Sequence, residues 1–288
     1  MRILLCLLAT WLIWGSTYLA IKFALVSLPP FIQMGSRFLV AGLAVLLWAR
    51  WQKAPWPTQT EWRNAAIIGA LMMVCGMGTT AFAEQTIASS LVVVFVACAP
   101  MLMVLFSRLF GVRTDAFELS GIAVGFIGVL LLVRGQGFSA SPIGLAAMCV
   151  SVTGWTVGSV LSRHRFPLAP GAMGYASEML CGSVLLSLVA LIRGETLQWP
   201  LLPSAVFAWG YLVVFGSLIA FNAYMFLLSQ VRPATASSYT LVCPVIGLAL
   251  GSTLAGETLS RSEWAASGVM LSGVVLVLWG ASRRQAQK

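Results

Sequence analysis

Apolar residues run along the chain in long stretches that are separated by short polar segments. A helix needs about 20 apolar residues to cross a bilayer core of about 30 Å. Ten stretches approach that length, so the sequence predicts an all-α polytopic membrane protein with ten transmembrane helices. The predicted spans are Ile3–Val26, Phe31–Ala49, Ala65–Ala83, Thr86–Phe106, Leu119–Val133, Ile143–Leu161, Pro170–Ile192, Ala205–Leu228, Ala234–Leu254 and Trp264–Ala281.

The composition excludes a soluble domain. Of the 288 residues, 59% are hydrophobic and 9% are charged, whereas roughly 25% are charged in an average soluble domain. A soluble fold of this length has no interior large enough to bury so much apolar surface. The six cysteines all lie in apolar stretches without C-x-x-C spacing, which indicates core residues rather than metal ligands. We therefore expect no metal and no cofactor.

The sparse charges predict an orientation in the membrane. Seventeen Lys and Arg face eight Asp and Glu, a net charge of +9. With the amino terminus inside, twelve basic residues fall on the inner side and four on the outer side, while Arg37 lies within a span. Because short inner loops of membrane proteins are rich in Lys and Arg, both termini are predicted to be cytoplasmic. The positive charge thus reports topology, and we expect no nucleic-acid partner.

The two halves of the chain resemble each other. The sequence GVLLL at 128–132 matches GVVLV at 273–277, and Trp14 corresponds to Trp155 at an offset of 141 positions. We interpret residues 1–137 and 138–288 as two five-helix repeats within one integrated membrane domain. An odd number of spans per repeat makes the second copy inverted, and such repeats are typical of carriers that work by alternating access.

Several motifs also resemble a known family. The first half carries Trp14-Gly15-Ser16-Thr17-Tyr18, then Pro29-Pro30 and Arg37-Phe38; the second carries Ala236-Ser237-Ser238, Pro244 and Leu254-Ala255-Gly256-Glu257. Together they resemble EamA-type members of the drug/metabolite transporter superfamily, with the aromatic-amino-acid exporters as the nearest branch. One departure is Gly111-Val112, where the family often has Gly-Glu. The resemblance implies an exporter of amino acids or related metabolites in a bacterial inner membrane, as a monomer or homodimer.

Two ionisable residues lie well inside predicted spans. Arg37 and Glu178 correspond at the repeat offset of 141, and a rise of about 1.5 Å per residue places their levels about 8 Å apart. Intramembrane charges usually face a protein interior or a water-filled path. They are therefore interpreted either as groups that bind substrate or a coupling proton, or as a structural ion pair or snorkelling side chains.

Small, aromatic and polar residues near the middle of the spans predict a largely apolar cavity between the repeats. Aromatic amino acids, methionine or threonine would suit such a cavity. Pro100 and Pro244 each remove a helix hydrogen bond and are predicted hinges. The predicted cavity residues are Trp14, Tyr18, Arg37, Gly76, Thr79, Phe82, Ser90, Trp155, Tyr175, Glu178, Asn222, Tyr224 and Tyr239.

Two alternatives stay open. The first is a multidrug exporter of lipophilic compounds, although small multidrug members of the superfamily use a Glu in the first helix and Ile3–Val26 has none. The second is a membrane-embedded enzyme acting on lipids, which usually needs clustered Asp, Glu or His. The sequence has one His, between two Arg at 163 and 165, and scattered acids. The leading interpretation is a carrier and not an enzyme.

Overall fold

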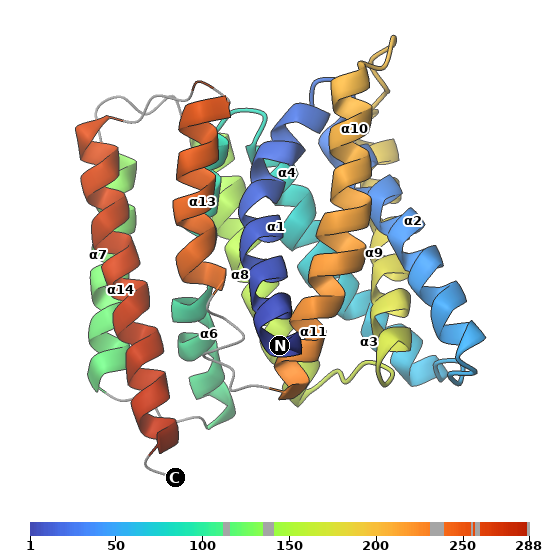
Figure 1. Cartoon of the computed structure of the whole chain (residues 1–288), viewed down its shortest axis with the longest axis horizontal. Coiled ribbons are helices and arrows are strands. Elements are labelled where there is room, and N and C mark those ends of the chain that lie inside the picture. Colours follow the sequence, from blue (N-terminus) through green and yellow to red (C-terminus); the bar gives the residue numbers. More distant parts are fainter. Residues whose placement is uncertain (112–115, 135–140, 231–238, 255, 257–259, 287–288) are drawn as a thin grey trace. The chain divides into compact units, whose positions relative to one another are not determined.

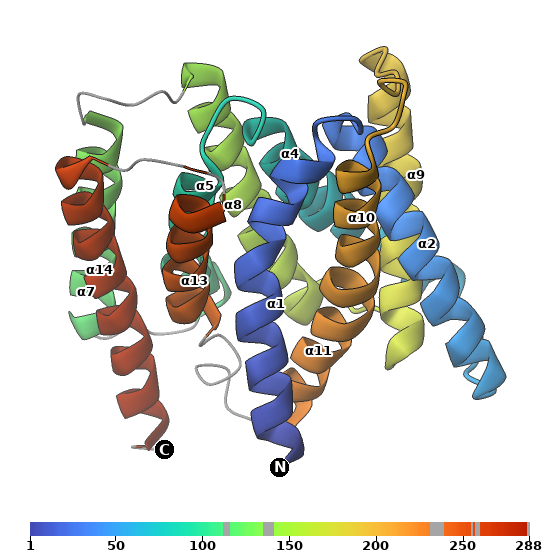
Figure 2. The ribbon, with the colours of Figure 1, turned by 45° about the horizontal axis from the view of Figure 1, so that its top comes forward.

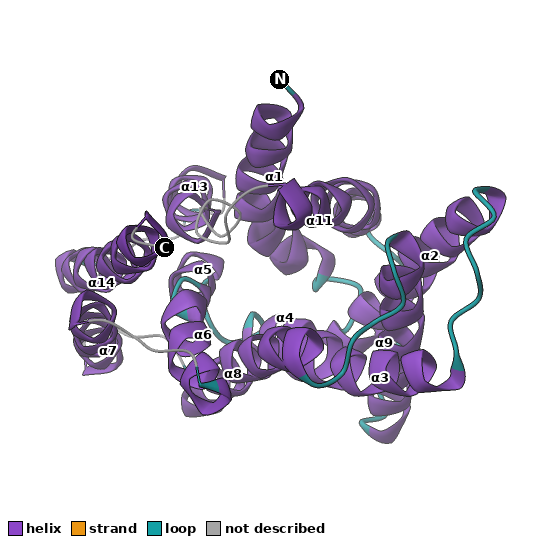
Figure 3. Cartoon of the chain, turned by 90° about the horizontal axis from the view of Figure 1, so that it is seen from below, coloured by secondary structure: helices purple, strands orange, loops and turns teal. Residues whose placement is uncertain are grey.

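The structure is a computed structural model that describes residues 1–111, 116–134, 141–230, 239–254, 256 and 260–286. Regular structure in these residues is helical throughout, with no strand (Figure 3). The chain forms two compact units: unit 1 is Met1–Leu19, Thr86–Leu145 and Ala223–Lys288, and unit 2 is Ala20–Gln85 and Ala146–Asn222. Each unit draws on both halves of the sequence. The predicted boundary near residue 137 concerns the sequence repeat and stays a prediction.

Six of the predicted spans are helices long and apolar enough to cross a membrane, within the part of the chain that the structure describes. The polar residues before Ala65 extend the third of them beyond the predicted start. The six are α1 (Arg2–Ala24), α2 (Pro30–Trp51), the run of α3 (Gln59–Gly69), η1 (Ala70–Gly78) and α4 (Thr79–Ala83), α8 (Pro142–His164), α9 (Ala172–Ile192), and the run of α10 (Pro203–Tyr211), η3 (Leu212–Ile219) and α11 (Ala220–Gln230) as far as Tyr224.

The described residues of the other four predicted spans are largely helical, but these helices are not among the six that are long and apolar enough to cross a membrane. Their crossing of the membrane therefore stays a prediction. The helices concerned, with a 3-10 turn named η2, are α5 (Ser89–Val96), α6 (Ala99–Ser107), η2 (Arg108–Phe110), α7 (Ala116–Arg134), α13 (Tyr239–Leu254) and α14 (Arg261–Ala286).

Unit 2 is organised around the pair α2 and α9, which lie side by side in Figures 1 and 2. α9 also packs against α3 and η1, and α2 packs against η3. Glycine makes the closest crossing possible: a Cβ on Gly69 of α3 would lie 3.0 Å from the backbone nitrogen of Gly182 on α9. A Cβ on Gly182 would in turn lie 2.6 Å from the Cγ of Met73. Larger residues at this crossing would force the helices apart.

The ends of the helices follow local sequence signals. α2 begins at Pro30, where a missing N–H costs nothing. α3 begins with a capping box: the Thr58 hydroxyl accepts from the backbone N–H of Glu61, while the Glu61 carboxylate accepts from that of Thr58. After α9, Gly194 adopts a left-handed conformation with φ of 66°, which suits glycine at the end of a helix.

Two spans of unit 2 contain a π-helical segment, η1 and η3. Beside η1, hydroxyl groups bind its backbone carbonyls: Thr80 and Ser151 donate to the carbonyl of Gly76 at 3.0 and 2.8 Å, and Thr79 donates to that of Cys75. π-helical turns are rare and are often found at functional sites. Gly76 and Thr79 were predicted as cavity residues, but nothing in the sequence indicated a π-helix at η1 or at η3.

Unit 1 contains the pair α7 and α14, which pack along their lengths (Figure 2). A Cβ on Gly273 of α14 would lie 2.5 Å from the backbone nitrogen of Gly125 on α7, so this pair also meets at glycine. α13 packs against α5. The helix of the fourth predicted span is divided between α5 and α6, just before Pro100. The hinge roles of Pro100 and Pro244 stay predictions, and the side chains of both lie outside the described residues.

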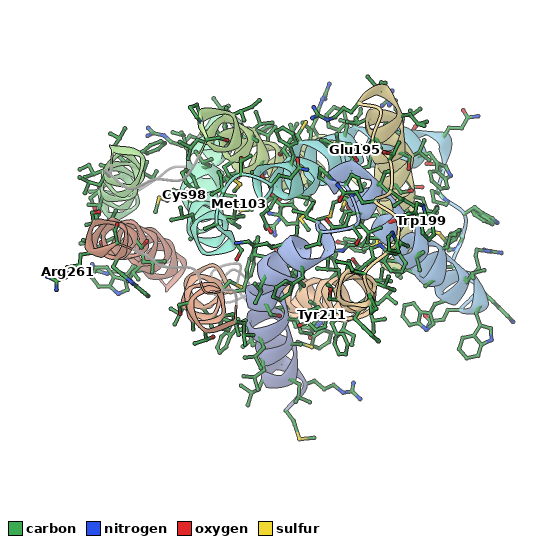
Figure 4. All side chains as sticks on the ribbon, turned by 90° about the horizontal axis from the view of Figure 1, so that it is seen from above. Cys98, Met103, Glu195, Trp199, Tyr211 and Arg261 are labelled. Carbon is green, nitrogen blue, oxygen red and sulfur yellow. The ribbon has the colours of Figure 1, made fainter. Side chains whose placement is uncertain are left out.

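The loop from α9 to α10 is tied to the start of α2, and Figure 4 labels Glu195 and Trp199 on this loop. The Oε2 atom of Glu195 accepts from the backbone N–H groups of Phe31 and Ile32, both at 3.0 Å. The Oγ of Ser27 accepts from the N–H of Leu202 at 3.1 Å. A carboxylate at the first turn of a helix satisfies N–H groups that have no partner within the helix. The loop thus serves as the cap of α2.

We predict that Glu195→Ala lowers the free energy of unfolding by about 1 kcal/mol, since two N–H groups of α2 lose their acceptor. Glu195→Gln keeps an acceptor oxygen and should cost less. Denaturant unfolding in detergent micelles measures both variants, and equal losses would contradict the role of Glu195 as a cap.

The same carboxyl group should make stability depend on pH. Burial raises the pKa of Glu195, against the opposing effects of its two backbone hydrogen bonds and of Arg193. The folded protein therefore binds a proton at Glu195 more readily than the unfolded chain does. Proton binding thus stabilises the fold, and this contribution is fullest at acid pH and is lost as pH rises through the raised pKa. Over that range the wild type should lose stability relative to Glu195→Gln.

Candidate functional site

Three of the predicted cavity residues form an aromatic cluster in unit 1. Trp14 on α1 contacts both Tyr224 on α11 and Tyr239 on α13, with ring centroids 5.0 and 4.7 Å away. The two tyrosine rings are 5.6 Å apart and nearly perpendicular. Aromatic rings prefer such tilted and edge-to-face geometries, and each of these side chains adds a polar group to an apolar surface. The structure thus brings together residues that are more than 200 positions apart in the sequence.

α1 approaches α13 closely at this cluster. A Cβ on Gly15 would lie 2.8 Å from the Cβ of Ile246, and the Sγ of Cys243 donates to the carbonyl oxygen of Trp11 at 3.7 Å. Tyr18 follows Trp14 by one helical turn on α1 and is half-buried. The side chain of Ser90, also predicted for the cavity, lies outside the described residues.

The predicted residues of unit 2 form separate contacts. Trp155 on α8 packs next to Gly76, where an added Cβ would lie 3.5 Å from its ring. Tyr175 on α9 lies 5.8 Å from the ring of Phe221 on α11. Asn222 is exposed, and its side-chain amide donates to the carbonyl of Leu218 in its own helix.

Phe82, at the end of α4, belongs to the same region as the Glu195 cap. Its ring is 6.3 Å from that of Phe31, and the guanidinium carbon of Arg193 lies 4.7 Å above it. Arg193 also lies 5.7 Å from the ring of Phe31. Cation–π contacts of this kind join the loop after α9 to two helices of the first half. Phe82 was predicted for the cavity, whereas Arg193 and Glu195 carried no signal in the sequence.

Arg37 is almost fully buried, with 1% of its surface exposed. Its Nε atom donates to the Oγ of Ser217 on η3 at 2.8 Å, and Nη1 lies 3.8 Å from the Sδ of Met34. The guanidinium group therefore bonds α2 to the π-helical segment of the other half. Whether Arg37 also lines a substrate pathway stays a prediction. Ser217 carried no signal in the sequence beyond its place 141 positions after Gly76.

Glu178 is 2% exposed on the face of α9 that packs against its neighbours. Its Oε1 atom is buried and accepts no hydrogen bond from the residues that the structure describes. The described contacts of Arg37 and Glu178 do not join the two side chains. Within the described residues no three His, Cys, Asp or Glu side chains are grouped as a metal site.

Ser151 and Thr80 form a polar contact that the sequence analysis did not predict. Their hydroxyl oxygens are 2.6 Å apart, and both hydroxyls reach the carbonyl of Gly76. Serine and threonine within apolar spans usually bond to their own helix, so sequence alone does not distinguish Ser151 from the rest. This network ties α8 to η1.

Comparison with known proteins identifies the class of protein that carries these features. The pattern of the EamA-like transporter family matches residues 1–134 and 142–279, and the chain belongs to this family of membrane transporters. The family and the names of its members indicate a transporter rather than an enzyme.

Three relatives and one solved structure bear on the comparison. The uncharacterized inner membrane transporter YedA of Escherichia coli strain K12 is 42% identical over 275 residues, covering 95% of this chain and 90% of the relative. The uncharacterized transporter sll0355 of Synechocystis is 28% identical over 95% of this chain and 88% of its own. A Salmonella typhimurium protein named "probable amino-acid metabolite efflux pump" is 22% identical over 96% and 94%.

The solved structure is a crystal structure of another protein that is 20% identical to this chain. The match covers 95% of this chain and 96% of the chain in the solved structure, with a TM-score of 0.68. At this identity the likeness shows that the two chains share a fold.

We predict that Ser217→Ala lowers the free energy of unfolding by about 2 kcal/mol, because a buried guanidinium group loses an acceptor. Ser177→Ala is the matched control: Ser177 is equally buried, but its hydroxyl bonds to the carbonyl of Gly174 in the same helix. Thermal unfolding in detergent compares the two variants. Equal shifts would show that the bond between Arg37 and Ser217 does not hold α2 to η3.

Proposed function

We propose that this protein is a carrier that exports amino acids, in particular aromatic ones, methionine or threonine, or related small metabolites. The observation that carries the proposal is membership of the EamA-like transporter family along both halves of the chain. The name of the Salmonella typhimurium relative supports amino-acid metabolites as the substrate class. The E. coli relative supports an inner-membrane location.

The mechanism we propose is alternating access by two inverted five-helix repeats, with both termini in the cytoplasm. Three observations support it. The family pattern matches the chain twice, at residues 1–134 and 142–279. The π-helical segments Ala70–Gly78 and Leu212–Ile219 correspond at nearly the same offset that relates Trp14 to Trp155. Corresponding helices also pack on each other: α2 on α9 in unit 2, and α7 on α14 in unit 1.

The cluster of Trp14, Tyr224 and Tyr239 supports an aromatic or apolar substrate. Its rings supply faces and edges for stacking, and the indole N–H and phenol O–H groups supply polar contacts of the kind that orient a ligand. The same rings would also attract a lipophilic cation through cation–π contacts. A multidrug exporter is therefore the second candidate. An enzyme acting on lipids has no comparable support.

A counterflow measurement distinguishes the two candidates. Purified protein in proteoliposomes loaded with unlabelled phenylalanine, methionine or threonine is expected to take up the labelled form of the same amino acid. Empty liposomes give the background. Uptake of labelled tetraphenylphosphonium without exchange of any of the three amino acids would favour the multidrug exporter instead.

We also predict that Trp14→Ala reduces phenylalanine counterflow about tenfold, since losing an aromatic stacking contact costs roughly 1 kcal/mol or more. Trp279→Ala is the control. Trp279 is also paired with an aromatic ring, that of Phe117 at 5.0 Å, but it lies on α14 outside the predicted cavity residues. Equal reductions in the two variants would exclude a specific role for the Trp14 cluster.

A further inference from the structure

Glu178 on α9 is a buried acid whose Oε1 atom lacks a hydrogen bond within the described residues. Its side chain is almost fully buried in a helix that crosses the membrane core, and Oε1 accepts no hydrogen bond within the described residues. A carboxylate in such a place is costly unless a counter-ion, hydrogen bonds or a ligand stabilises it. Glu178 therefore needs a partner, and a bound proton removes the charge outright.

The packing around this residue restricts what the partner can be. The carbonyl oxygen of Glu178 would lie 3.1 Å from a Cβ on Gly69, and the backbone of Gly182 would lie 3.0 Å from the same atom. The two helices thus approach so closely on this face that even a methyl group would be tight. Because only 2% of the surface of Glu178 is accessible to solvent, its carboxyl group leaves no room for a substrate ammonium group in this state, whereas a proton needs none.

The other charged groups on the helices around Glu178 have contacts elsewhere or lie at a distance. Glu61 on α3 is engaged in the capping box with Thr58, and it precedes Gly69 by eight residues, or about 12 Å along the helix. Arg37 on α2 donates to Ser217. The titratable and charged side chains on α2, α3, η1 and α9 are Arg37, Arg50, Glu61, Arg63, Cys75, Tyr175, Glu178 and Cys181.

The segment next to Glu178's helix is a π-helix. α9 packs directly against η1, the π-helical segment that continues α3. π-helical turns are rare departures from regular α-helical hydrogen bonding and are often found at functional sites. Movement of α3 and η1 relative to α9 would open the tight crossing at Gly69 and Gly182 and let water reach the carboxyl group.

We infer that Glu178 is the proton-binding group of this carrier and couples proton entry to export of the substrate. The inference rests on the proposed function. In the closed state the carboxyl group holds a proton beside the tight crossing of α9 with α3 and η1. When the crossing opens to the inner side, the proton leaves for the cytoplasm; when it opens to the outer side, a new proton binds. One proton thus moves inward for each substrate that moves outward, with no bond made or broken other than O–H.

The test uses the full-length protein in proteoliposomes with labelled phenylalanine, methionine and threonine. For one-to-one exchange, an interior more acidic by about one pH unit should drive about tenfold accumulation of the exchanged amino acid. Glu178→Gln keeps the size and removes the ionisation, so it should retain counterflow at equal pH but lose this accumulation. Glu195→Gln, which removes an acid outside the spans, should accumulate substrate like the wild type.

Each outcome decides between the explanations. Accumulation by Glu178→Gln equal to that of the wild type overturns the inference while counterflow still supports the proposed function. Absence of counterflow in the wild type with all three amino acids removes the proposed function and the inference with it.

A second measurement covers the case in which Glu178→Gln is inactive in both assays. On addition of the exchanged amino acid, infrared difference spectroscopy of the wild type should show loss of a protonated-carboxyl band, and Glu178→Gln should lack this change. A wild-type spectrum without the band would overturn the inference.

Discussion

Close approach of helix backbones at glycine is the constraint on which both units depend. Lipid provides no hydrophobic drive that brings apolar helices together, so their association relies on dispersion contacts and on small residues that let backbones meet. Gly69 and Gly182 allow α3 to cross α9, and Gly125 and Gly273 allow α7 to lie along α14. In the same way Gly15 lets α1 approach α13 beside the aromatic cluster of unit 1.

The second constraint is that polar groups within the membrane must find partners inside the protein. In unit 2 the guanidinium group of Arg37 uses Ser217, and the carbonyl of Gly76 uses the hydroxyls of Thr80 and Ser151. Ser217 and Gly76 occupy corresponding positions of the two π-helical segments. A side chain from another helix therefore binds each loosened span at an equivalent point. Such paired contacts would let corresponding segments exchange conformations in the mechanism that we propose.

Much of the fold could be predicted because apolar length is a local property. The six full-length spans fall within a few residues of their predicted limits, and the largest difference, at α3, comes from a polar first turn stabilised by Thr58 and Glu61. The candidate site was less predictable. Trp14, Tyr224 and Tyr239 were named from their type and depth, yet nothing local indicated that they share one cluster. The sequence offered Glu178 as one possible partner of Arg37. It did not indicate Ser217, since a serine in an apolar span has no distinctive pattern.

The sequence by itself determined the solvent of this protein, its helical class and its membership of the EamA-like transporters, because hydropathy and family motifs are written in consecutive residues. Tertiary structure decided which buried groups are satisfied. The Oε1 of Glu178 has no described hydrogen-bond donor, while Arg37 has an acceptor. That difference depends on which helix faces cross and how closely, and these are set by glycine contacts between residues more than 100 positions apart.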